Sequence, residues 1–525
     1  MKSVKSWIVC LVLLCGAAVL MAQSPQWRWA TREGLMLTDR GQSIATDSQG
    51  NQYVTGQITT LYGPSPNIFV KKYDPNGNII WSVSAGGTGD DEGLGIAVDG
   101  TGNVYVTGYF EGTATFGSQT LTASGNNDIF VAKLTPSGNW LWAVKAGGTS
   151  IDKGYDIAVD GTGNAYVTGH FHGTATFGSR TLTSTDIGPD IFVAKLSPYG
   201  TWRLAVQAGD IFDDYGCGIA VDSSGNAYVT GYFNYAATFG SYTLTAFVLL
   251  DTFVAKLSPY GTWLWAVGAA GWDFVGGYDI AVDGSGNAYV TGYFNDSATF
   301  GSYNLTSFGS TDIFVAKINS SGTWLWAVKA GGTSGDFGYG IAVDVAGNAY
   351  VTGFFEGTAT FGSRTLTSSG EKDIFAAKLN PSGTWRWAYK AGGTDSDIGY
   401  GIAVDEAANA YVTGIFRGTA TFGSHTMDAM GGTDIFVAKL SYIPPKAPVN
   451  VQIMMNGNSA IITWDAVTED ILGRPFTPDG YYIYESSDPL GGFTYLGHSS
   501  STAYIDSSVG EYEPRVFYLV KAYKN

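Results

Sequence analysis

The tetrapeptide Tyr-Val-Thr-Gly occurs seven times in this chain, and its regular spacing restricts the fold more than any other sequence feature. The steps between its glycines are 52, 61, 62, 61, 61 and 61 residues. These glycines are Gly56, Gly108, Gly169, Gly231, Gly292, Gly353 and Gly414. A period of this length predicts an array of similar units that stack and bury one continuous core. We number these repeats 1 to 7 in chain order.

Each repeat contains four short runs that favour β-structure. The first run ends at an aspartate nine residues before the glycine, as in Gly-Ile-Ala-Val-Asp99, and the second run is Tyr-Val-Thr-Gly itself. Turn residues such as Asp-Gly-Thr-Gly-Asn separate the two, which predicts a hairpin. The third run resembles Ile-Phe-Val-Ala-Lys-Leu, and the fourth carries Trp-x-Trp. Twelve of the 15 tryptophans belong to the fourth run, so we interpret them as packing residues.

All four runs are apolar almost throughout, so both faces of each small sheet must be covered. Sheets stacked face to face around an axis meet this condition, which predicts an all-β propeller. The segment Trp27-Arg-Trp-Ala30 is a fourth run with no partner before it, and repeat 7 ends after Leu440 without one. We therefore expect a seven-bladed β-propeller over residues 23–442, closed by an N-terminal strand in the last blade.

These motifs resemble the bacterial seven-bladed β-propeller repeat family, the SBBP repeat. The resemblance rests on Ile341-Ala-Val-Asp344, Asn348-Ala-Tyr-Val-Thr-Gly353, Ala359-Thr-Phe-Gly-Ser363 and Trp385-Arg-Trp387, and it covers about four fifths of the chain. It implies a propeller fold and an exported or cell-surface setting. The family has no common catalytic residue to carry over.

The two ends of the chain differ from the repeats. Residues 1–22 have two lysines followed by an apolar run, which predicts a secretory signal peptide cleaved near Ala22. Residues 443–448 read as a proline-rich linker. Residues 449–525 contain short alternating strands that resemble a fibronectin type III module, a small β-sandwich, with Trp464 on its second strand and Tyr518 on the tyrosine-corner strand. The last strand of that module is not evident.

Charge and cysteine content exclude several classes of protein. The formal net charge is -17, which disfavours nucleic acid as a partner. Cleavage near Ala22 would leave Cys217 as the only cysteine, so no intrachain disulfide is expected. No second apolar run reaches the length of a membrane span, and we therefore expect a secreted, periplasmic or cell-surface monomer without membrane insertion.

The loops between the fourth and first runs are long, and each carries an aspartate. These are Asp39, Asp91, Asp152, Asp213, Asp273, Asp336 and Asp397. If the first strand is innermost, the carboxylates encircle the channel mouth, where they suit Ca²⁺. Aspartates in such loops also stabilise turns through hydrogen bonds to the backbone, and spacing alone does not choose between these roles. No cofactor is expected, with Ca²⁺ as the possible exception, and the identity of any metal stays open.

Four further features of the sequence bear on a possible site. Trp272 departs from the repeat on the same loop face, where it could stack on a sugar ring or pack locally. His170-Phe-His172 carries ligand chemistry without a third partner, and Cys217 reads as a buried inert thiol. The segment Thr-Ala-Thr-Phe-Gly-Ser predicts a small hairpin between the second and third runs, which either covers a strand edge or shapes a binding rim.

These observations predict an exported, non-catalytic binding or adhesion scaffold whose loop face contacts a polysaccharide or a cell-surface protein. The near-identical repeats carry no distinct set of acids, bases or nucleophiles, so no catalytic residue is assigned. Two alternatives stay open. One is a propeller enzyme of the lyase, glycosidase or lactonase type with a metal on the loop face, and the other is a structural protein of a surface layer.

Overall fold

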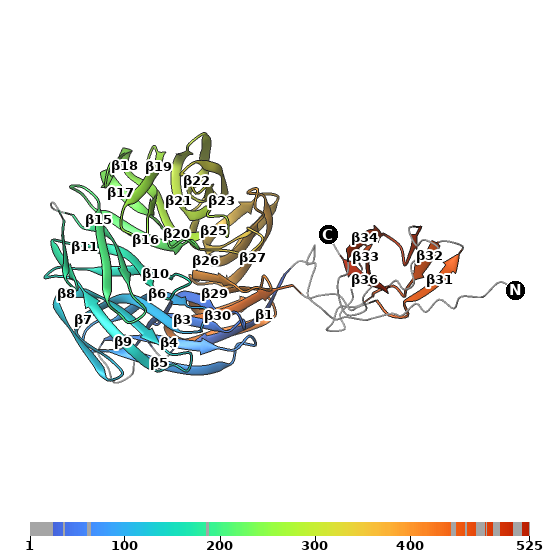
Figure 1. Cartoon of the computed structure of the whole chain (residues 1–525), viewed down its shortest axis with the longest axis horizontal. Helices are drawn as coiled ribbons and strands as arrows, with labels where there is room; N and C mark the ends of the chain where they lie inside the picture. The colour runs from blue at the N-terminus through green and yellow to red at the C-terminus, as the bar shows by residue number, and fades with distance from the viewer. Residues whose placement is uncertain are drawn as a thin grey trace. The chain divides into compact units, whose positions relative to one another are not determined.

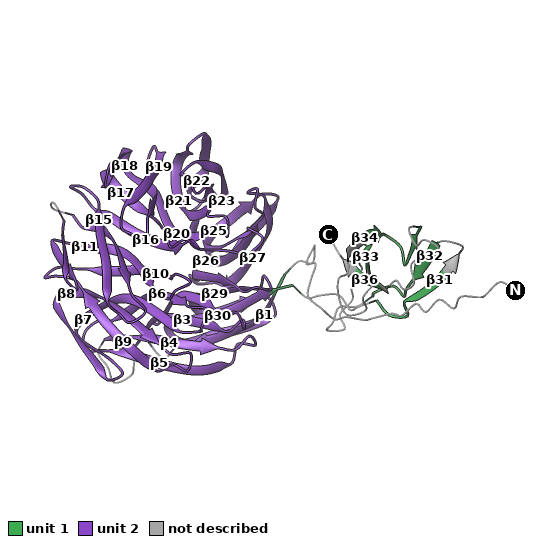
Figure 2. Cartoon of the chain, viewed as in Figure 1, with its two compact units in different colours: residues 1–26, 441–525 green, residues 27–440 purple. Residues whose placement is uncertain are grey.

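The computed structural model describes residues 25–34, 37–59, 65–184, 188–442, 448–456, 459–468, 478, 480–486, 494–507 and 517–523. The chain forms two compact units, residues 27–440 and the flanking residues 1–26 and 441–525 (Figure 2). The expected signal peptide and most of the expected linker lie outside the described residues. Every regular element in the described part is a β-strand, which confirms the all-β prediction. Among the described residues no helix is long and apolar enough to span a membrane.

Repeats 1 to 6 each fold into four antiparallel strands that pair in chain order, and repeat 7 supplies the first three. The four runs of the sequence form these strands. The first strands are β2 (Arg40–Thr46), β6 (Glu92–Val98), β10 (Lys153–Val159), β16 (Asp214–Val221), β20 (Val275–Val282), β24 (Phe337–Val343) and β28 (Ile398–Val404). The second strands are β3 (Gln52–Thr59), β7 (Val104–Phe116), β11 (Ala165–Phe171), β17 (Ala227–Phe239), β21 (Ala288–Phe300), β25 (Ala349–Phe361) and β29 (Ala410–Phe422).

The third and fourth strands complete each sheet. The third strands are β4 (Pro66–Tyr73), β8 (Gln119–Leu134), β14 (Asp190–Leu196), β18 (Tyr242–Leu257), β22 (Tyr303–Ile318), β26 (Arg364–Leu379) and β30 (His425–Ser441). The fourth strands are β5 (Ile79–Gly87), β9 (Trp140–Ala146), β15 (Trp202–Ala208), β19 (Trp263–Gly271), β23 (Trp324–Gly332) and β27 (Trp385–Gly393). The N-terminal strand β1 (Gln26–Glu33) is hydrogen-bonded beside β30.

The first strands surround a common centre, with the fourth strands toward the rim (Figure 1). Each first strand contacts the first strands of its two neighbours, and β28 contacts β2. A hollow of about 370 Å³ lies between them, lined by the aliphatic residues near the end of every first strand, such as Ile157, Ala158 and Val159. Small sheets arranged in this way form a β-propeller.

The cores lie between the sheets of consecutive repeats. One cluster joins Tyr105 and Val131 of repeat 2 to Val167 and Phe192 of repeat 3, all fully buried. Another cluster joins Ile44 of repeat 1 to Tyr411 of repeat 7, and Trp29 of β1 packs against it. Both faces of the sheets are therefore covered, as the apolar runs predict.

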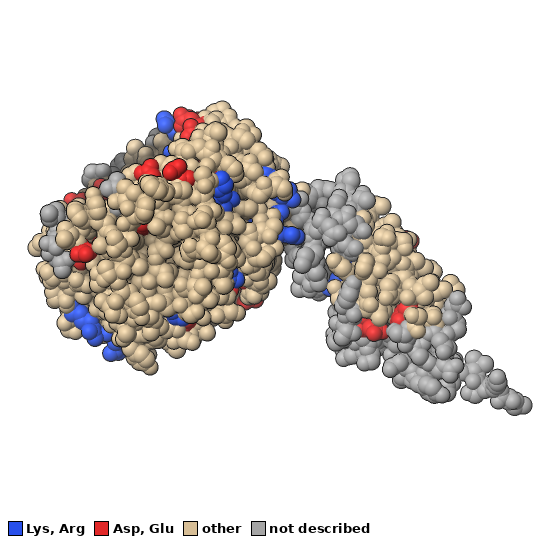
Figure 3. All heavy atoms as spheres, turned by 90° about the horizontal axis from the view of Figure 1, so that it is seen from above, with Lys and Arg blue, Asp and Glu red and all other residues tan. Residues whose placement is uncertain are grey.

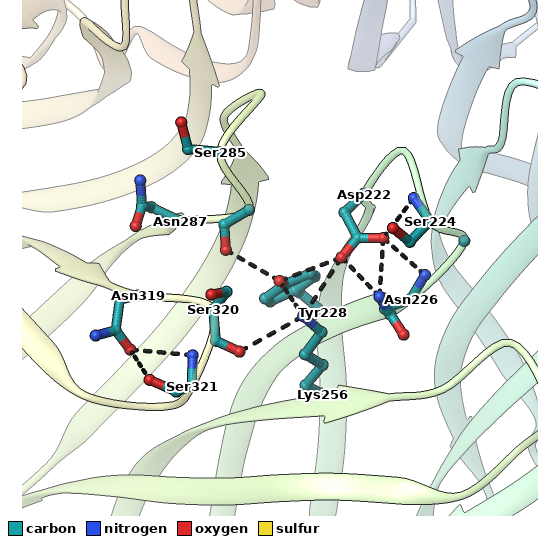
Figure 4. A network of polar contacts seen from close by, with 12 residues as sticks. Asp222, Ser224, Asn226, Tyr228, Lys256, Ser285, Asn287, Asn319, Ser320 and Ser321 are labelled. Atoms are coloured by element: carbon teal, nitrogen blue, oxygen red, sulfur yellow. Dashed lines mark hydrogen bonds and ion pairs between the residues drawn. The ribbon is translucent and has the colours of Figure 1, made fainter.

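The tight turn after the first strand of repeat 4 is linked to repeat 5 through a polar network (Figure 4), and Tyr105, Tyr166, Tyr289 and Tyr350 make the corresponding bond in other repeats. In repeat 4, Asp222 accepts hydrogen bonds from the backbone and side chain of Asn226, and the Tyr228 hydroxyl donates to the Gly286 carbonyl of repeat 5 over 3.0 Å. Lys256 Nζ lies 3.4 Å from Asp222 Oδ2. Burial raises the pKa of Asp222, but the Asn226 hydrogen bonds and the Lys256 charge outweigh it, so the pKa lies below its usual value.

The Thr-Ala-Thr-Phe-Gly-Ser segments form the predicted hairpins, and they join consecutive repeats. In repeat 2 the hairpin extends β7 and β8, and Thr115 and Ala114 pair with Gly86 and Gly87 of the preceding fourth strand. In repeat 3 the hairpin is separate, with strands β12 (Thr174–Phe177) and β13 (Arg180–Thr183). The hairpin phenylalanine packs edge-on against the first tryptophan of its repeat, as Phe116 does against Trp140 at 5.3 Å.

The C-terminal unit has its own small core. Strands β31 (Gln452–Asn456), β32 (Ser459–Thr463) and β35 (Ala503–Asp506) form one sheet, and β34 (Thr494–Ser499), β33 (Gly480–Ser486) and β36 (Phe517–Tyr523) form another. Trp464, directly after β32, packs with Tyr481 and Tyr518 in this core. The Tyr518 hydroxyl donates a hydrogen bond to Asp506.

Candidate functional site

The loops that enter the first strands carry buried aspartates eight residues before the aspartate of the tight turn. We call these residues the loop aspartates. They are Asp39, Asp91, Asp152, Asp214, Asp336 and Asp397, and each is fully buried. The two carboxylate oxygens of Asp91 accept backbone N–H groups from Gly87 and Glu111, at 2.8 and 3.2 Å. Asp152, Asp214, Asp336 and Asp397 repeat this pattern. Such bonds hold the loop against the end of the second strand.

Burial is the main cause of the raised pKa values of these carboxyl groups. It raises the pKa of Asp91 and Asp152 to about 6, that of Asp336 and Asp397 to about 7, and that of Asp214 to about 8. A second carboxylate adds to the effect in repeat 3, where a Cβ atom on Gly147 would lie 2.8 Å from Asp128 and 2.9 Å from Asp152. Gly147 has a φ of 144°, which also favours glycine at this point.

Two of the seven predicted aspartates occupy other places. Asp213 is exposed, and its neighbour Asp214 holds the buried position of the loop aspartates. In repeat 5 that position belongs to Val275, which is buried, while Asp273 is partly exposed and accepts a hydrogen bond from Asn295. The prediction of an equivalent ring of seven is therefore wrong at these two positions, because the loops of repeats 4 and 5 differ in register from the others.

The loop aspartates use their oxygens for backbone hydrogen bonds. Within the described ranges, no group of three or more His, Cys, Asp or Glu side chains is placed to hold a metal ion. The calcium site stays a prediction, and the hydrogen bonds give these carboxylates a turn-stabilising role.

Trp272 lies in an exposed aromatic and aliphatic surface formed by repeats 4 and 5. It is 66% exposed and contacts Phe247 edge-on at 4.8 Å. Phe212 contacts Tyr235 at 4.7 Å, and Leu250 pairs with Phe274 through a β-bridge. We call this surface the apolar patch. Its exposed members are Ile211, Phe212, Tyr235, Phe247, Val248, Trp272 and Phe274.

A second set of residues that differ between repeats lies on the innermost strands. Each first strand has a β-bulge, for example between Gly154 and Asp156, which leaves the residue between them unpaired. These bulge residues are Gln42, Leu94, Tyr155, Cys217, Tyr278, Tyr339 and Tyr400. All of them are partly exposed although their strands are central, so their exposed surface faces the channel. Bulges commonly direct side chains at functional sites in this way.

Aromatic side chains dominate one half of this layer. The rings of Tyr278 and Tyr339 are 5.0 Å apart, and those of Tyr339 and Tyr400 are 5.4 Å apart. Tyr293 and Phe337 extend the set, with ring centroids 4.7 Å apart. The arrangement presents an arc of aromatic rings from repeats 5, 6 and 7.

Charged and polar side chains fill the other half. Gln42 and Tyr109 both donate hydrogen bonds to the Glu92 carboxylate, at 2.7 and 3.1 Å. Lys153 Nζ lies 3.9 Å from the centroid of the Tyr109 ring. The Lys153 pKa is lowered by burial, which the charge of Glu92 opposes.

Asp156 and Asp279 follow two of the bulges, where the other repeats have glycine or serine. Asp156 accepts the N–H groups of Ile157 and of Ile219 in the next repeat, both at 2.8 Å. Asp279 likewise accepts those of Ile280 and Ile341. Both side chains are partly exposed. Desolvation raises the pKa of each carboxyl group, and the charge of Asp156 raises that of Asp279 further, so the two groups titrate as a pair.

The remaining predicted residues also lie close to this layer. His170 is 6% exposed, packs between Tyr155 and Tyr215, and has no hydrogen-bond partner at Nδ1 in the part of the chain that the structure describes. Burial lowers the pKa of His170 to about 3. Burial together with the charges of Asp156 and Asp279 raises the pKa of Cys217 to about 12, as expected for an unreactive thiol.

Sequence reasoning did not identify the bulge layer as a site. The signal was the variation within the otherwise constant motif Gly-Tyr-Gly-Ile-Ala-Val-Asp, in which the second and third positions change from repeat to repeat. Variation against an almost constant background marks positions that do not serve packing alone.

Comparison with known proteins agrees with this architecture. Residues 141–170, 205–232 and 325–353 match the β-propeller repeat family SBBP, which confirms that the chain carries repeats of this family. An uncharacterized WD repeat-containing protein, L264 of Acanthamoeba polyphaga mimivirus, is 27% identical over 65% of this chain and 31% of its own length. The regulatory protein FlaEY of Caulobacter vibrioides is 25% identical over 74% of this chain and 41% of its own length.

The chain thus spans well under half the length of these two relatives. Among solved structures, the WD40 domain of Neurospora crassa Pan2 is 11% identical, with a TM-score of 0.37, over 77% of this chain and 97% of that domain.

Proposed function

We propose that this protein is an exported, non-catalytic binding scaffold, built as a seven-bladed propeller that β1 closes and followed by a fibronectin type III-like module. Trp27 supports the closure: it packs edge-on against Phe422 at 5.4 Å, and its Nε1 donates to the Lys390 carbonyl of the preceding repeat. Trp385 makes the same two contacts inside the ring, with Phe361 and Lys329.

The apolar patch is the observation that carries the binding function. Large apolar side chains exposed together on a rigid scaffold mark interaction surfaces, whereas isolated ones do not. On the face drawn in Figure 3, the charged side chains among the described residues are scattered and gather into no single patch, so charge does not define a partner there. The ligand we propose is a polysaccharide or a cell-surface protein, since Trp and Phe rings suit sugar faces and apolar side chains alike.

The cellular setting follows from the sequence. Residues 1–22 support export, and the product would then act in the periplasm, at the cell surface or outside the cell. Enzymatic activity is not part of the proposal.

The experiment is a binding screen of the mature chain against polysaccharides and surface proteins, with calcium and with a chelator. Replacing Trp272 or Phe247 by alanine should weaken binding to any hit by about tenfold or more, because each removes a large contact from the patch. Tyr260→Ala is the matched control, since Tyr260 is 91% exposed in a tight turn that belongs to another part of the repeat.

Two results would argue against the proposal. One is turnover of a bound polysaccharide that stops when a single loop residue is changed. The other is binding that depends on Tyr260 as much as on Trp272.

A further inference from the structure

We propose that the central channel holds a second, independent site, which binds an organic ammonium ion through Asp156, Asp279 and the tyrosines of the bulge layer. The proposal rests on the bulge residues and on the two aspartates that follow them, because these positions differ from repeat to repeat. It does not depend on the apolar patch or on the partner proposed for it.

The two carboxylates are fixed in place. Asp156 joins β10 to β16 through its bonds to Ile157 and Ile219, and Asp279 joins β20 to β24 in the same way. Only Gly218 separates the two positions around the ring, and a Cβ atom on it would lie 2.9 Å from the Asp279 Cα atom. Each oxygen accepts one backbone N–H, which leaves further lone pairs for a ligand.

Within the described residues, Asp156 and Asp279 take part in no ion pair. Two cationic side chains act on residues of this layer. Lys153 lies over the Tyr109 ring and interacts with Glu92. Burial raises the pKa of Tyr400, and the charge of Arg40 opposes this effect. Burial raises the pKa values of both carboxyl groups, and the charge of Asp156 raises that of Asp279 further, so ionisation of both groups is unfavourable without a cation. A cationic ligand would favour the ionised form of both groups, whereas a neutral sugar would not.

The tyrosine rings of the aromatic arc favour an organic ammonium ion over a metal ion. The rings of Tyr278, Tyr339 and Tyr400 form a continuous series on neighbouring strands and are partly exposed. Tyrosine faces attract ammonium groups. A metal ion would need more anionic ligands than two, and the described residues offer no such group.

Two neighbouring features suit the rest of the ligand. The hollow of about 370 Å³ begins at the next residues of the same strands, Ile157 and Ile280, and can accept an alkyl chain. In addition, His170 is almost fully buried, packs against Tyr155, and has no hydrogen-bond partner at Nδ1 within the described residues. In the tautomer protonated at Nε2, this nitrogen accepts an N–H donor. The ligand is thus an alkylammonium, either a free amine or the side chain of a lysine.

The test is calorimetric titration of the whole protein at neutral pH with 1,5-diaminopentane, tetramethylammonium, and a capped lysine peptide. Asp279→Asn should weaken amine binding by about tenfold or more, because the amide cannot ionise when the cation binds. Tyr339→Leu should also weaken it, whereas Tyr339→Phe should bind as the parent does, since the ring and not the hydroxyl meets the cation.

Control variants distinguish this site from amine binding elsewhere on the protein. Trp272→Ala should leave amine affinity unchanged, and each variant should keep the parent's circular dichroism spectrum. Stronger binding of the lysine peptide than of its Nε-acetylated form would identify a protein side chain as the source, and binding of the free amines alone would identify a small molecule. The proposal is overturned if no ammonium binds at about 10 mM, if neopentyl alcohol binds equally well, if calcium binds in place of the amines, or if folded Asp279→Asn and Tyr339→Leu bind like the parent.

Discussion

Asp213 and Asp214 are neighbours in the sequence, yet only Asp214 is buried and accepts the N–H groups of Asp210 and Asn234. The pattern of an aspartate in every loop was visible in the sequence, but not which of two adjacent aspartates points inward. Register within an irregular loop depends on the neighbouring strands, so the sequence could not determine it. Trp272 was recognisable as a departure from the repeat, and the structure places it in the exposed apolar patch.

Asp214 should make the stability of the protein depend on pH. Its folded-state pKa of about 8 lies above the value of about 4 expected when the chain is unfolded, so the native state binds the extra proton. This contribution is fully present below the unfolded pKa and is lost as the pH rises through about 8. The free energy of unfolding of the parent should therefore fall between about pH 4 and pH 8, and less steeply in Asp214→Asn.

Urea denaturation at several pH values measures this slope. Asp213→Asn is the matched control, because it changes the exposed neighbour, and its slope should equal that of the parent. An Asp214→Asn slope equal to the parent's would contradict the assignment.

Tyr228 should contribute to the contact between repeats 4 and 5. Its hydroxyl bonds the Gly286 carbonyl and contacts Asp222 and Lys256, all of which lose a partner in Tyr228→Phe. The free energy of unfolding should fall by about 1–3 kcal/mol, as for other buried hydrogen bonds that leave polar atoms unsatisfied. Tyr260→Phe should change it by less than about 0.5 kcal/mol, and equal effects would show that the network adds no stability.

At the scale of strands, most of the structure could be predicted. The four runs of each repeat and the hairpin after the second run are strands where the sequence indicated them. The strand β35 was not predicted, because Ala503–Asp506 is only four residues long and gives too short a pattern. The bulge in every first strand was also missed, since a single unpaired residue leaves no periodic signature. The layer that we propose as a site depends on those bulges.

Strand β1 should be as important as any strand inside the propeller. Trp27 is buried against Phe422, so Trp27→Ala should lower the free energy of unfolding by about 3–5 kcal/mol. Thermal or urea unfolding of the mature chain tests this. Trp272→Ala removes a tryptophan that is mostly exposed and should change stability little, and similar losses for the two variants would refute a special role for β1.

At the scale of the molecule, the two units have separate cores. Among the described residues, the core around Trp464 contains residues of the C-terminal unit alone, and the cores of the propeller contain none of them. The propeller could be predicted because the same strand motifs occur in seven repeats, so each strand assignment is supported seven times. The C-terminal module has a single copy of each strand, and its relation to the fibronectin type III fold stays a prediction.

Calorimetry should therefore show two independent unfolding transitions. A chain that ends at Tyr442 should keep the propeller transition at the same midpoint, because removal of the module takes nothing from the propeller cores. A midpoint several degrees lower would mean that the module stabilises the propeller directly.

The pairing of β1 with β30 has a consequence for biosynthesis. Contacts between consecutive repeats can form as soon as the next repeat leaves the ribosome, but the ion pair of Arg32 with Asp434 joins residues 402 positions apart. Strand β1 is thus synthesised first, but it can pair with β30 only after the seventh repeat has been synthesised. During that interval its exposed edge can pair with another nascent chain, so this protein should depend on a holding chaperone until translation of repeat 7 ends.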